Sequence, residues 1–399
     1  MSINKVRLED CCVSISDGDH LPPPKAEKGI PFITISNINS YNQIDFTNTM
    51  FVPEDYYNNL DTKRKAQRGD ILYSVVGSFG IPILISEDKK FVFQRHIAIL
   101  RPDTSVDSRY LYYKMLSKDF YAMADAAAIG AAQRTISLTA LRNMEITLPN
   151  IDIQRKIADI LSKYDNLIEN NQKQIKLLEE ASQRLYKEWF VDLHFPGYES
   201  TTITDGVPDG WNHNTVDSIV NLLSGYAFKS TTFDDSGDFK IVTIKNVQDG
   251  FFDGENVNRI LEMPSKMPDH CVLQDGDILL SLTGNVGRVC LVNGENYLLN
   301  QRVAKLDSKF KGYTYCLFRS KDMFDAMNNL ANGAAQQNLS PIRTGNIEIP
   351  IPNDTLLADF EKIINPIIKK ILILNKEISE LKQARDRLLP KLMSGEIEV

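Results

Sequence analysis

The sequence predicts an α+β protein made of two similar halves. Each half is a β-rich mixed domain followed by a long helix, and we expect the two helices to pair as an antiparallel coiled coil. Three observations predict this: an apolar stripe with a 3.5-residue period from Ile157 to Trp189, its return 203 residues later, and a β-type segment repeated at an offset of 207 residues. Two such helices at one fixed offset indicate duplication.

Both stripes follow alternating steps of four and three residues, the spacing of a coiled-coil seam. Eight of the ten positions in the first stripe are apolar or aromatic: Ile157, Leu161, Tyr164, Ile168, Asn171, Ile175, Leu178, Ser182, Leu185 and Trp189. The second stripe matches it without insertion or deletion: Phe360, Ile364, Ile367, Ile371, Leu374, Ile378, Leu381, Arg385, Leu388 and Leu392. Each stripe predicts about 50 Å of helix at about 1.5 Å per residue.

Composition is that of an ordinary globular protein. The chain has 399 residues, 43% hydrophobic and 24% charged, and no apolar run approaches the ~20 residues of a membrane span. The N-terminus lacks the apolar segment of a secretory signal, and the five cysteines form no CxxC pair. We therefore expect a cytoplasmic protein with reduced thiols, without a disulfide framework or a zinc site.

The formal net charge of −7 argues mildly against bulk, non-specific binding of nucleic acid. It does not exclude a local basic cleft, because charges more than about 10 Å away are largely screened.

The first domain covers residues 1–150. Short runs at 31–35, 70–76 and 96–100 are typical of strands, and residues 108–127 predict one helix. The first long helix follows from about 153 to 190.

Residues 196–206 read as an exposed, flexible linker, because they lack periodicity and are rich in turn formers. A second β-rich domain covers 207–353, and the second long helix runs from about 355 to 393. Within that helix, Pro366 is expected to cause a kink or mark the effective start, and Pro390 to loosen or end the last turn.

Short segments repeat between the β-rich domains. The matches are Gln67–Gly80 with Gln274–Gly287, Gln94-Arg95 with Gln301-Arg302, Gly130–Gln133 with Gly333–Gln336, and Ile33–Asn37 with Val242–Asn246. The first pair reads as a strand running into a glycine-bounded loop, which suits a tight turn or the close approach of a ligand. Gln and Arg can bond base edges or phosphates, although a surface pair without a ligand is equally compatible with the residues.

Signals of catalysis are absent from the sequence. There is no motif for amino-methyl transfer, no glycine-rich dinucleotide or S-adenosylmethionine loop, and no GxxxxGK[ST] phosphate loop. The five histidines form no HExxH pair. A repeated frame with two divergent surfaces instead indicates recognition of two different targets by one geometry.

Two further segments carry a family resemblance. Val207-Pro-Asp-Gly-Trp211 resembles the entry to a target recognition domain, and Leu388–Ile397 resembles the closing segment of the same family. Together with the Gly-Asp-Ile-Leu loops and the duplicated helices, essentially the whole chain resembles the specificity (S) subunit of Type I restriction–modification enzymes. The first half departs from the pattern, because it begins near Val6 without a clear Val-Pro-x-Gly-Trp.

The resemblance implies target recognition domains at 1–150 and 207–353, and spacer helices at 151–195 and 354–399. Each domain would read one half of a bipartite, asymmetric site in double-stranded DNA. The helices would act as a ruler and dock two methyltransferase subunits, with motor or nuclease subunits joining in a restriction complex. The chain would be non-catalytic and bind no metal or cofactor, since S-adenosylmethionine would be held by the partner methyltransferase.

We predict DNA contacts at loop positions that match between the halves or adjoin a match. These are Ser36, Asn37, Ser78, Gln94, Arg95, Gln133 and Arg134 in the first half, and Lys245, Asn246, Asn285, Arg288, Gln301, Arg302, Gln336 and Gln337 in the second.

Two other functions fit the same features. A stand-alone, two-headed DNA-binding regulator would need no partner enzyme, and a coiled-coil scaffold for proteins would suit the acidic net charge. Against the regulator, Tyr186, Phe190 and Leu193 at the end of the first helix read as a partner-binding surface.

Overall fold

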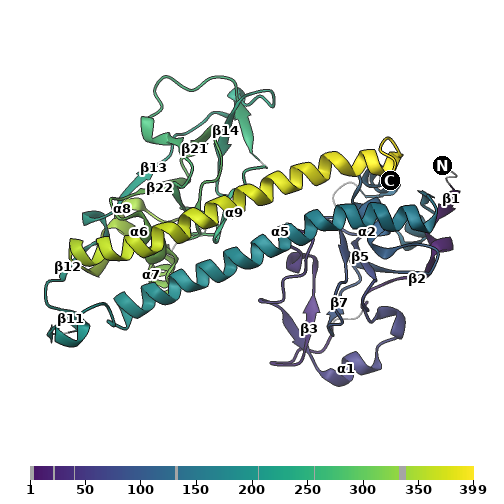
Figure 1. The fold of residues 1–399 in the computed structure, drawn as a ribbon, viewed down its shortest axis with the longest axis horizontal. Helices are drawn as coiled ribbons and strands as arrows, with labels where there is room; N and C mark the ends of the chain where they lie inside the picture. Colours follow the sequence, from purple (N-terminus) through teal and green to yellow (C-terminus); the bar gives the residue numbers. More distant parts are fainter. Residues whose placement is uncertain are drawn as a thin grey trace. The chain divides into compact units, whose positions relative to one another are not determined.

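The computed structural model describes residues 4–20, 23–39, 41–130, 134–204, 206–255, 257–331 and 338–399. The chain forms two compact units, Met1–Leu167 with Leu381–Val399, and Ile168–Glu380. Each unit contains one β-rich domain and segments of both long helices (Figure 1). We call the domains N-terminal and C-terminal.

The N-terminal domain has a four-stranded antiparallel sheet, a three-stranded sheet and a two-stranded ribbon. The order of the first is β2-β8-β5-β6: Cys12–Asp17, Ile97–Pro102, Ile71–Ser74 and Pro82–Leu84. The second is β4-β3-β7, Met50–Val52, Ile30–Ile33 and Val92–Phe93, in which β3 and β7 are parallel. The ribbon pairs β1, Asn4–Arg7, with β9, Glu145–Leu148.

The C-terminal domain repeats this topology. Its four-stranded antiparallel sheet is β13-β22-β19-β20: Asn221–Ser224, Val303–Asp307, Ile278–Ser281 and Val289–Leu291. The second sheet gains a strand and has the order β17-β14-β21-β18: Asn258–Ile260, Phe239–Val242, Tyr297–Leu299 and Val272–Leu273. The ribbon is β12, Asn212–Thr215, with β23, Glu348–Ile351, and a hairpin joins β15, Val247–Gln248, to β16, Phe251–Phe252.

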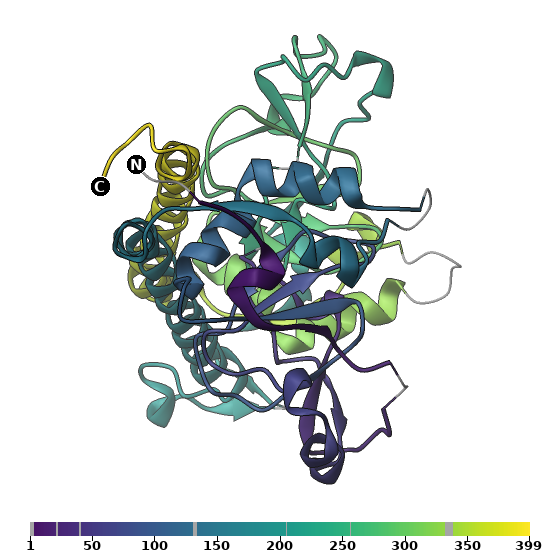
Figure 2. The same cartoon turned by 90° about the vertical axis from the view of Figure 1, so that its right-hand side faces the viewer.

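Short helices cover the sheets in both domains. Those of the N-terminal domain are α1 Glu54–Asn59, α2 Ser108–Leu116, α3 Lys118–Ala127 and α4 Leu138–Arg142; those of the C-terminal domain are α6 Lys311–Arg319, α7 Lys321–Ala331 and α8 Pro341–Gly345. The Tyr73 ring of β5 meets the Phe120 ring of α3 edge-on, with centroids 5.8 Å apart. The backbone of the N-terminal domain, coloured from purple to blue, can be followed in Figure 2. Single 3-10 turns lie at Leu8–Cys11, Ile35–Asn37, Thr62–Arg64, Tyr198–Ser200, Val216–Ser218, Ser230–Thr232 and Asp269–Cys271.

The single helix predicted for residues 108–127 is wrong, because the chain breaks at Ser117. The Ser117 hydroxyl donates to the Lys114 carbonyl at 2.7 Å and accepts the Phe120 N–H at 3.3 Å. One side chain thus ends α2 and caps the start of α3, which satisfies backbone groups that a helix end otherwise leaves open.

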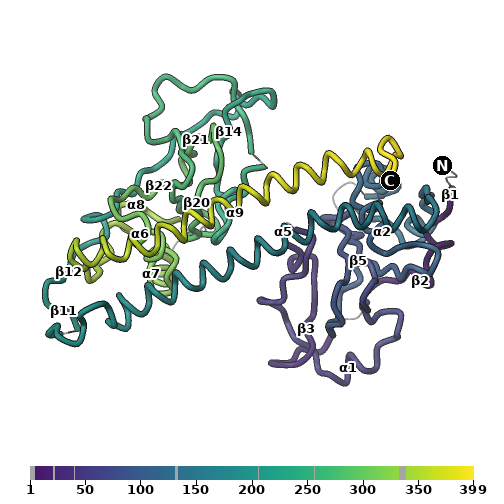
Figure 3. Tube along the Cα trace, in the orientation of Figure 1, coloured from purple at the N-terminus to yellow at the C-terminus, as the bar shows by residue number. Residues whose placement is uncertain are grey.

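The two long helices are α5, Ile151–Tyr186, and α9, Asp354–Ser394. They are antiparallel within each unit, as predicted. In the second unit, Asn171 Nδ2 donates to Glu377 Oε2 at 3.0 Å, while Tyr186, later in α5, faces Phe360, earlier in α9. In the first unit, Arg385 pairs with Asp165 at 2.6 Å. The segments of α5 and α9 belonging to one unit can be followed in Figure 3.

The two prolines do not set the limits of α9, so the predictions that Pro366 marks its effective start and that Pro390 ends it are wrong. Helix α9 begins at Asp354, well before Pro366, and continues through Pro390 to Ser394. Pro366 lies between Ile364 and Ile371, which are 0% and 1% exposed, so burial of the flanking turns offsets the lost backbone bond. The helix ends where Gly395 adopts φ +77° and donates its N–H to the Leu392 carbonyl.

The end of α5 is part of a hydrophobic core and does not form the partner-binding surface that we expected. After Tyr186 the chain makes one π-helical segment, Lys187–Val191. Tyr186 and Phe190 are 6% and 7% exposed, and Leu193 packs against the same cluster. These three residues therefore give no evidence against a stand-alone regulator.

The linker is more ordered than its composition suggests. Phe195 is buried with its ring 5.4 Å from that of Trp211. Beyond it, β10, Ile203–Thr204, pairs with β11, Val207–Pro208. An aromatic anchor and a hairpin thus connect α5 to the C-terminal domain.

Candidate nucleic-acid interface

The repeated Gln-x-Gly-Asp segment forms a self-capped turn in both domains. The turns are Gln67–Asp70 and Gln274–Asp277, and in each the aspartate carboxylate accepts the glutamine N–H, at 2.9 and 2.8 Å. The glycines have φ of +92° and +82°, a left-handed conformation that glycine adopts at little cost. Both aspartates are 2% exposed, so these turns support the strands β5 and β19 and are not ligand loops.

A loop of the same size follows each of these strands. Ser74 and Ser281 are buried, and their hydroxyls accept the N–H of Ile81 at 2.9 Å and of Arg288 at 3.0 Å. Each loop is thereby closed on itself, and Ser78 and Asn285 are exposed within it.

Backbone hydrogen bonds bring three predicted segments together in the N-terminal domain. The Val75 N–H donates to the His96 carbonyl at 2.9 Å. The Ile136 N–H donates to the Val75 carbonyl at 2.9 Å, and the Gly77 N–H to the Arg134 carbonyl at 3.0 Å. We name residues 75–80, 94–96 and 134–136 the N-terminal three-loop surface.

The same three segments meet in the C-terminal domain. The Leu282 N–H donates to the Arg302 carbonyl at 3.0 Å, and the Leu339 N–H to the Leu282 carbonyl at 2.7 Å. Residues 282–287, 300–302 and 338–339 form the C-terminal three-loop surface. Loops that are far apart in each sequence half therefore lie side by side at equivalent places.

Strand register corrects the predicted equivalence of the two Gln-Arg pairs. The sheets pair Ser74 with Ile97 and Ser281 with Val303. The residue offset between the domains is therefore 207 for β5 and β19, but 206 for β8 and β22. The C-terminal domain has one residue fewer between its equivalents of β6 and β7. The match of Gln94-Arg95 with Gln301-Arg302 is wrong by one position.

Hydrogen bonds of the loop itself agree with this shift. The Gln94 N–H donates to the Ile33 carbonyl and the Asn300 N–H to the Val242 carbonyl, each at 3.1 Å. Arg302 is therefore the structural equivalent of His96, a residue that our sequence comparison missed. Aligning identical residues paired Arg302 with Arg95, and only the strand register shows that Arg302 is equivalent to His96.

The predicted contact residues differ in exposure. Ser36, Ser78, Arg95, Lys245, Asn285, Gln301 and Arg302 are exposed, while Gln94, Arg134 and Arg288 are half-buried. Among the described residues, neither Arg95 nor Arg302 has a side-chain ion pair within the protein. Gln133, Gln336 and Gln337 lie outside the described residues.

Asn37 and Asn246 have a structural role that argues against the predicted DNA contact. The Asn246 side chain is 0% exposed; its Oδ1 accepts the Thr243 N–H at 2.8 Å, and its Nδ2 donates to the Asp253 carbonyl at 2.8 Å. Asn37 makes the corresponding bonds to the Thr34 N–H and the Asn48 carbonyl, at 2.9 and 3.2 Å. Their repetition reflects a turn geometry that both domains share, and the same side-chain bonds occupy the amide groups that were predicted to contact DNA.

Two predicted arginines are partly engaged within the protein. Arg134 pairs with Asp125 at 3.1 Å and stacks on the Phe79 ring at 5.7 Å. Arg288 donates to the Gln248 side chain. Contact with DNA would require these side chains to share or exchange partners.

Other kinds of site find no support in the described part of the chain. No group of three or more His, Cys, Asp or Glu side chains there is arranged to hold a metal ion, and all five cysteines are free thiols. None of its helices combines the length and apolar character that a bilayer crossing requires.

Comparison with known proteins identifies the repeated unit. The family model for the Type I restriction modification DNA specificity domain matches residues 4–180 and again residues 208–383. The chain belongs to this family. Its two specificity domains correspond to the two sequence halves, each with most of its long helix.

Relatives of the specificity-domain family extend over much of the chain. The Methanocaldococcus jannaschii Type I restriction enzyme MjaIX specificity subunit is 27% identical over 312 residues, 75% of this chain and 71% of that protein. The Haemophilus influenzae HindI specificity subunit is 20% identical over 92% of this chain and 95% of its own length. A crystal structure of a Type I S subunit from M. genitalium, 19% identical, has a TM-score of 0.55 and covers 98% of this chain and 96% of its own, so the fold is shared.

A buried polar network attaches the C-terminal specificity domain to α5. Glu179 of α5 accepts a hydrogen bond from the Tyr315 hydroxyl of α6 and lies 3.2 Å from Arg319 Nε. Arg319 also reaches Asp249 at 3.1 Å. Burial raises the pKa of Glu179 above its ordinary value, although Arg319 and Tyr315 act in the opposite direction.

The N-terminal specificity domain uses a similar set of groups. The Tyr113 hydroxyl of α2 donates to Asp165 of α5 at 2.6 Å, and Arg385 of α9 pairs with the same carboxylate at 2.6 Å. Each domain is thus attached to the long helices by a tyrosine, a carboxylate and an arginine. Such groups favour one geometry, because removing one partner leaves a buried or half-buried charge unpaired.

Proposed function

We propose that this chain is the non-catalytic, sequence-specific DNA-recognition subunit of a Type I restriction–modification complex. The observation that carries the proposal is one backbone frame, present twice, with different exposed side chains in equivalent loops. Arg95 in one three-loop surface corresponds to Gln301 in the other, and His96 corresponds to Arg302. One docking geometry with two sets of donors suits an asymmetric, bipartite site in double-stranded DNA.

The exposed members of the three-loop surfaces are the proposed DNA contacts. Arg302 and Arg95 suit guanine edges or phosphates, and Gln301 suits an adenine edge. Ser78 and Asn285 add short donors and acceptors within the glycine loops. Ser36 and Lys245 lie on the neighbouring turn that the Asn37 and Asn246 side chains hold in place.

The paired long helices would act as the spacer between the two half-sites. A helix pair of about 50 Å corresponds to at most about 15 base pairs at ~3.4 Å each, so base pairs under the helices would be counted and not read. Exposed apolar side chains on both helices in the second unit, Leu177, Ile363 and Ile373, support a further role as a dock for methyltransferase subunits.

In this proposal the chemistry belongs to the partners. Two methyltransferase subunits would hold S-adenosylmethionine and flip the target adenine out of the helix, while this chain positions them. Motor and nuclease subunits would join for restriction. The chain itself would bind no cofactor.

The test is to map DNA methylation at single-base resolution in the source cells, with and without this gene. Loss of one bipartite, asymmetric adenine-methylation motif is the expected result, and it would also give the sequence read by the two domains. If the pattern is unchanged, a pull-down for a bound methyltransferase follows. Absence of such a partner would contradict the proposal and favour a stand-alone DNA-binding regulator.

A further inference from the structure

A dense group of cations lies on the turn between α1 and β5. The segment Thr62–Arg68 holds four cationic side chains, Lys63, Arg64, Lys65 and Arg68, and begins with the 3-10 turn Thr62–Arg64. We call Thr62–Arg68 the basic turn. Sequence reasoning did not single it out, because a short charge run is usually a solvated surface.

The internal repeat supplies a comparison for this segment. The C-terminal domain has a matching 3-10 turn, Asp269–Cys271, at an offset of 207 residues. The equivalent segment Asp269–Asp275 carries two aspartates and one histidine but no lysine or arginine. The frame is nevertheless the same, since the self-capped turns Gln67–Asp70 and Gln274–Asp277 follow in both domains. The fold therefore does not require the cations.

The basic turn lies along the edge of the N-terminal sheet, next to the N-terminal three-loop surface. The Lys63 carbonyl accepts the Ser16 hydroxyl of β2 at 2.8 Å, and the Lys65 carbonyl accepts Arg101 of β8 at 2.9 Å. Arg64 lies 3.9 Å from Asp19, whose carbonyl accepts the Arg95 N–H at 3.0 Å. Asp19 thus links Arg64 of the basic turn to the loop that carries Arg95.

Most of these cations are not neutralised within the protein. Arg64 is at 3.9 Å from both Asp17 and Asp19, the limit of an ion pair, while Lys65 donates to the Asn58 carbonyl at 2.8 Å. Lys63 and Arg68 are exposed, and neither side chain has an ion pair with a described residue.

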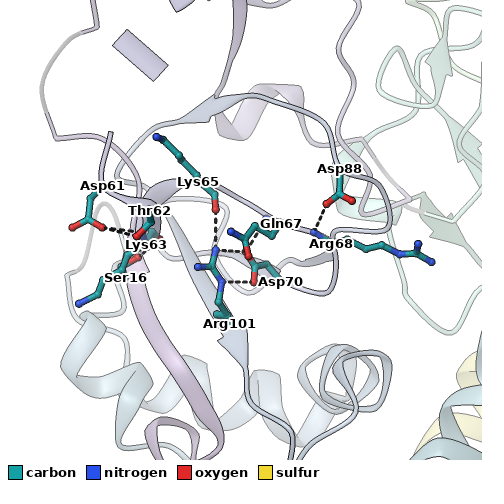
Figure 4. A network of polar contacts seen from close by, with 10 residues as sticks. All are labelled: Ser16, Asp61, Thr62, Lys63, Lys65, Gln67, Arg68, Asp70, Asp88 and Arg101. Carbon is teal, nitrogen blue, oxygen red and sulfur yellow. Dashed lines mark hydrogen bonds and ion pairs between the residues drawn. The ribbon is translucent and has the colours of Figure 1, made fainter. Parts of the chain in front are cut away.

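Two carboxylates bond the backbone of the basic turn, not its cationic side chains. Asp61 accepts the Lys63 N–H at 2.9 Å, and Asp88 accepts the Arg68 N–H at 3.1 Å. In Figure 4 the Arg68 side chain extends away from the Asp70–Arg101 pair. The turn is thus held by its main chain, and the ends of Lys63 and Arg68 are left for an external anion.

We infer that the basic turn binds the phosphate backbone of DNA beside the half-site read by the N-terminal domain. This inference rests on the proposed function. The C-terminal domain lacks an equivalent contact, so the two domains share base-reading geometry but differ in electrostatic contribution. Phosphate contacts position a protein on DNA without specifying sequence. The N-terminal domain can therefore have such contacts at this turn, and the C-terminal domain can lack them, without a change in how bases are read.

The experiment measures how duplex binding by the full-length chain depends on salt. The probe is a mixed-sequence 30-base-pair duplex, which reports phosphate contacts without knowledge of the target. Replacing Lys63→Gln and Arg68→Gln together is expected to reduce the slope of log affinity against log salt by about 2, since each released phosphate contact contributes about 0.9. Both side chains are exposed, so an unchanged melting temperature is the expected check on folding.

The matched control carries the same loss of charge in the second unit. Lys309→Gln with Lys362→Gln removes two exposed cations that form surface ion pairs with Asp354 and Asp359. This control should retain the wild-type slope. Equal slopes for the basic-turn variant and the control would overturn the inference while leaving the proposed function intact. A wild-type chain that binds no duplex at any salt would overturn both.

A transplant tests the claim of asymmetry. Asp275→Arg places a cation at the C-terminal equivalent of Arg68, in an exposed position. The expected result is a slope steeper by about 1. An unchanged slope would contradict the conclusion that this turn position faces the DNA backbone.

Discussion

Arg302 and His96 occupy one structural position in the two domains and differ in what they can recognise. Arginine offers a fixed fork of donors that matches two acceptors on guanine, whereas histidine offers a single donor or acceptor on each ring nitrogen. The backbone carbonyls of His96 and Arg302 accept equivalent hydrogen bonds, from the N–H groups of Val75 and Leu282. Exchange of side chains at this point therefore changes chemistry without changing geometry.

Arg302→Ala is predicted to relax recognition at one half-site only. Loss of a bidentate base contact costs about 1–3 kcal/mol of discrimination, and the N-terminal domain keeps all of its own contacts. The readout is the methylation motif written by the complete complex. Lys309→Ala, which removes an exposed cation from the same domain outside its three-loop surface, serves as the control. An equal loss of preference at both half-sites would contradict the assignment.

Among the elements, the paired helices contain a polar position that the apolar stripe does not explain. Asn171 is 6% exposed and donates across the pair to Glu377 at 3.0 Å. Its counterpart in the other stripe is the apolar Leu374, so the asparagine occurs in one helix only. A buried asparagine in a coiled-coil seam fixes register at some cost in stability.

Asn171→Leu is therefore predicted to leave the melting temperature unchanged or higher while loosening helix register. In the proposed complex this should appear as methylation at more than one spacer length. Ser182→Ala is the matched control, since the buried Ser182 hydroxyl donates only to Leu178 in its own helix, at 2.8 Å. A large fall in melting temperature together with a single retained spacer would show that Asn171 contributes stability and does not set register.

At the scale of the whole molecule, duplication gives the C-terminal ends of α5 and α9 the same spacing of apolar residues. Leu389 and Leu392 of α9 pack into the core that contains Ile157 and Leu161. Tyr186 and Trp189 of α5 lie 203 residues before them, at the offset that relates the two helices. A fragment that contains only the first sequence half therefore has a core that the end of α9 no longer covers. It also has the end of α5, whose apolar residues have the spacing needed to cover that core.

A fragment of residues 1–195 is predicted to form a dimer through its helix and to bind a palindromic version of its half-site. Tyr186 and Trp189 of one copy would replace Leu389 and Leu392 on the other, burying aromatic area at the cost of some overpacking. Sedimentation gives the mass. Leu161→Asp should abolish the dimer because this side chain is 0% exposed, whereas Leu177→Asp, at an exposed position, should not. A well-folded monomer of the unmodified fragment would contradict the prediction.

The features that the sequence determined by itself are those set by local periodicity and by repetition. A 3.5-residue stripe buries one face of a helix wherever that helix lies, so the long helices and their duplication follow from spacing alone. The paired β-rich domains follow from the matched strand and turn segments, whose glycines and aspartates make the same turns in both halves. The family assignment rests on the same repetition.

Tertiary structure decided which equivalent residues face outward. Asn37 and Asn246 match because their side chains hold the same turn, and Tyr186 and Phe190 are covered by a core that is assembled from distant segments. The one-residue shift that aligns His96 with Arg302 depends on strand register. Register arises from hydrogen bonds between strands and cannot be predicted from the sequence of either strand alone. The basic turn was identified by comparing the two domains. The C-terminal domain makes the same turn without cations, so the cations of the basic turn are not needed for folding.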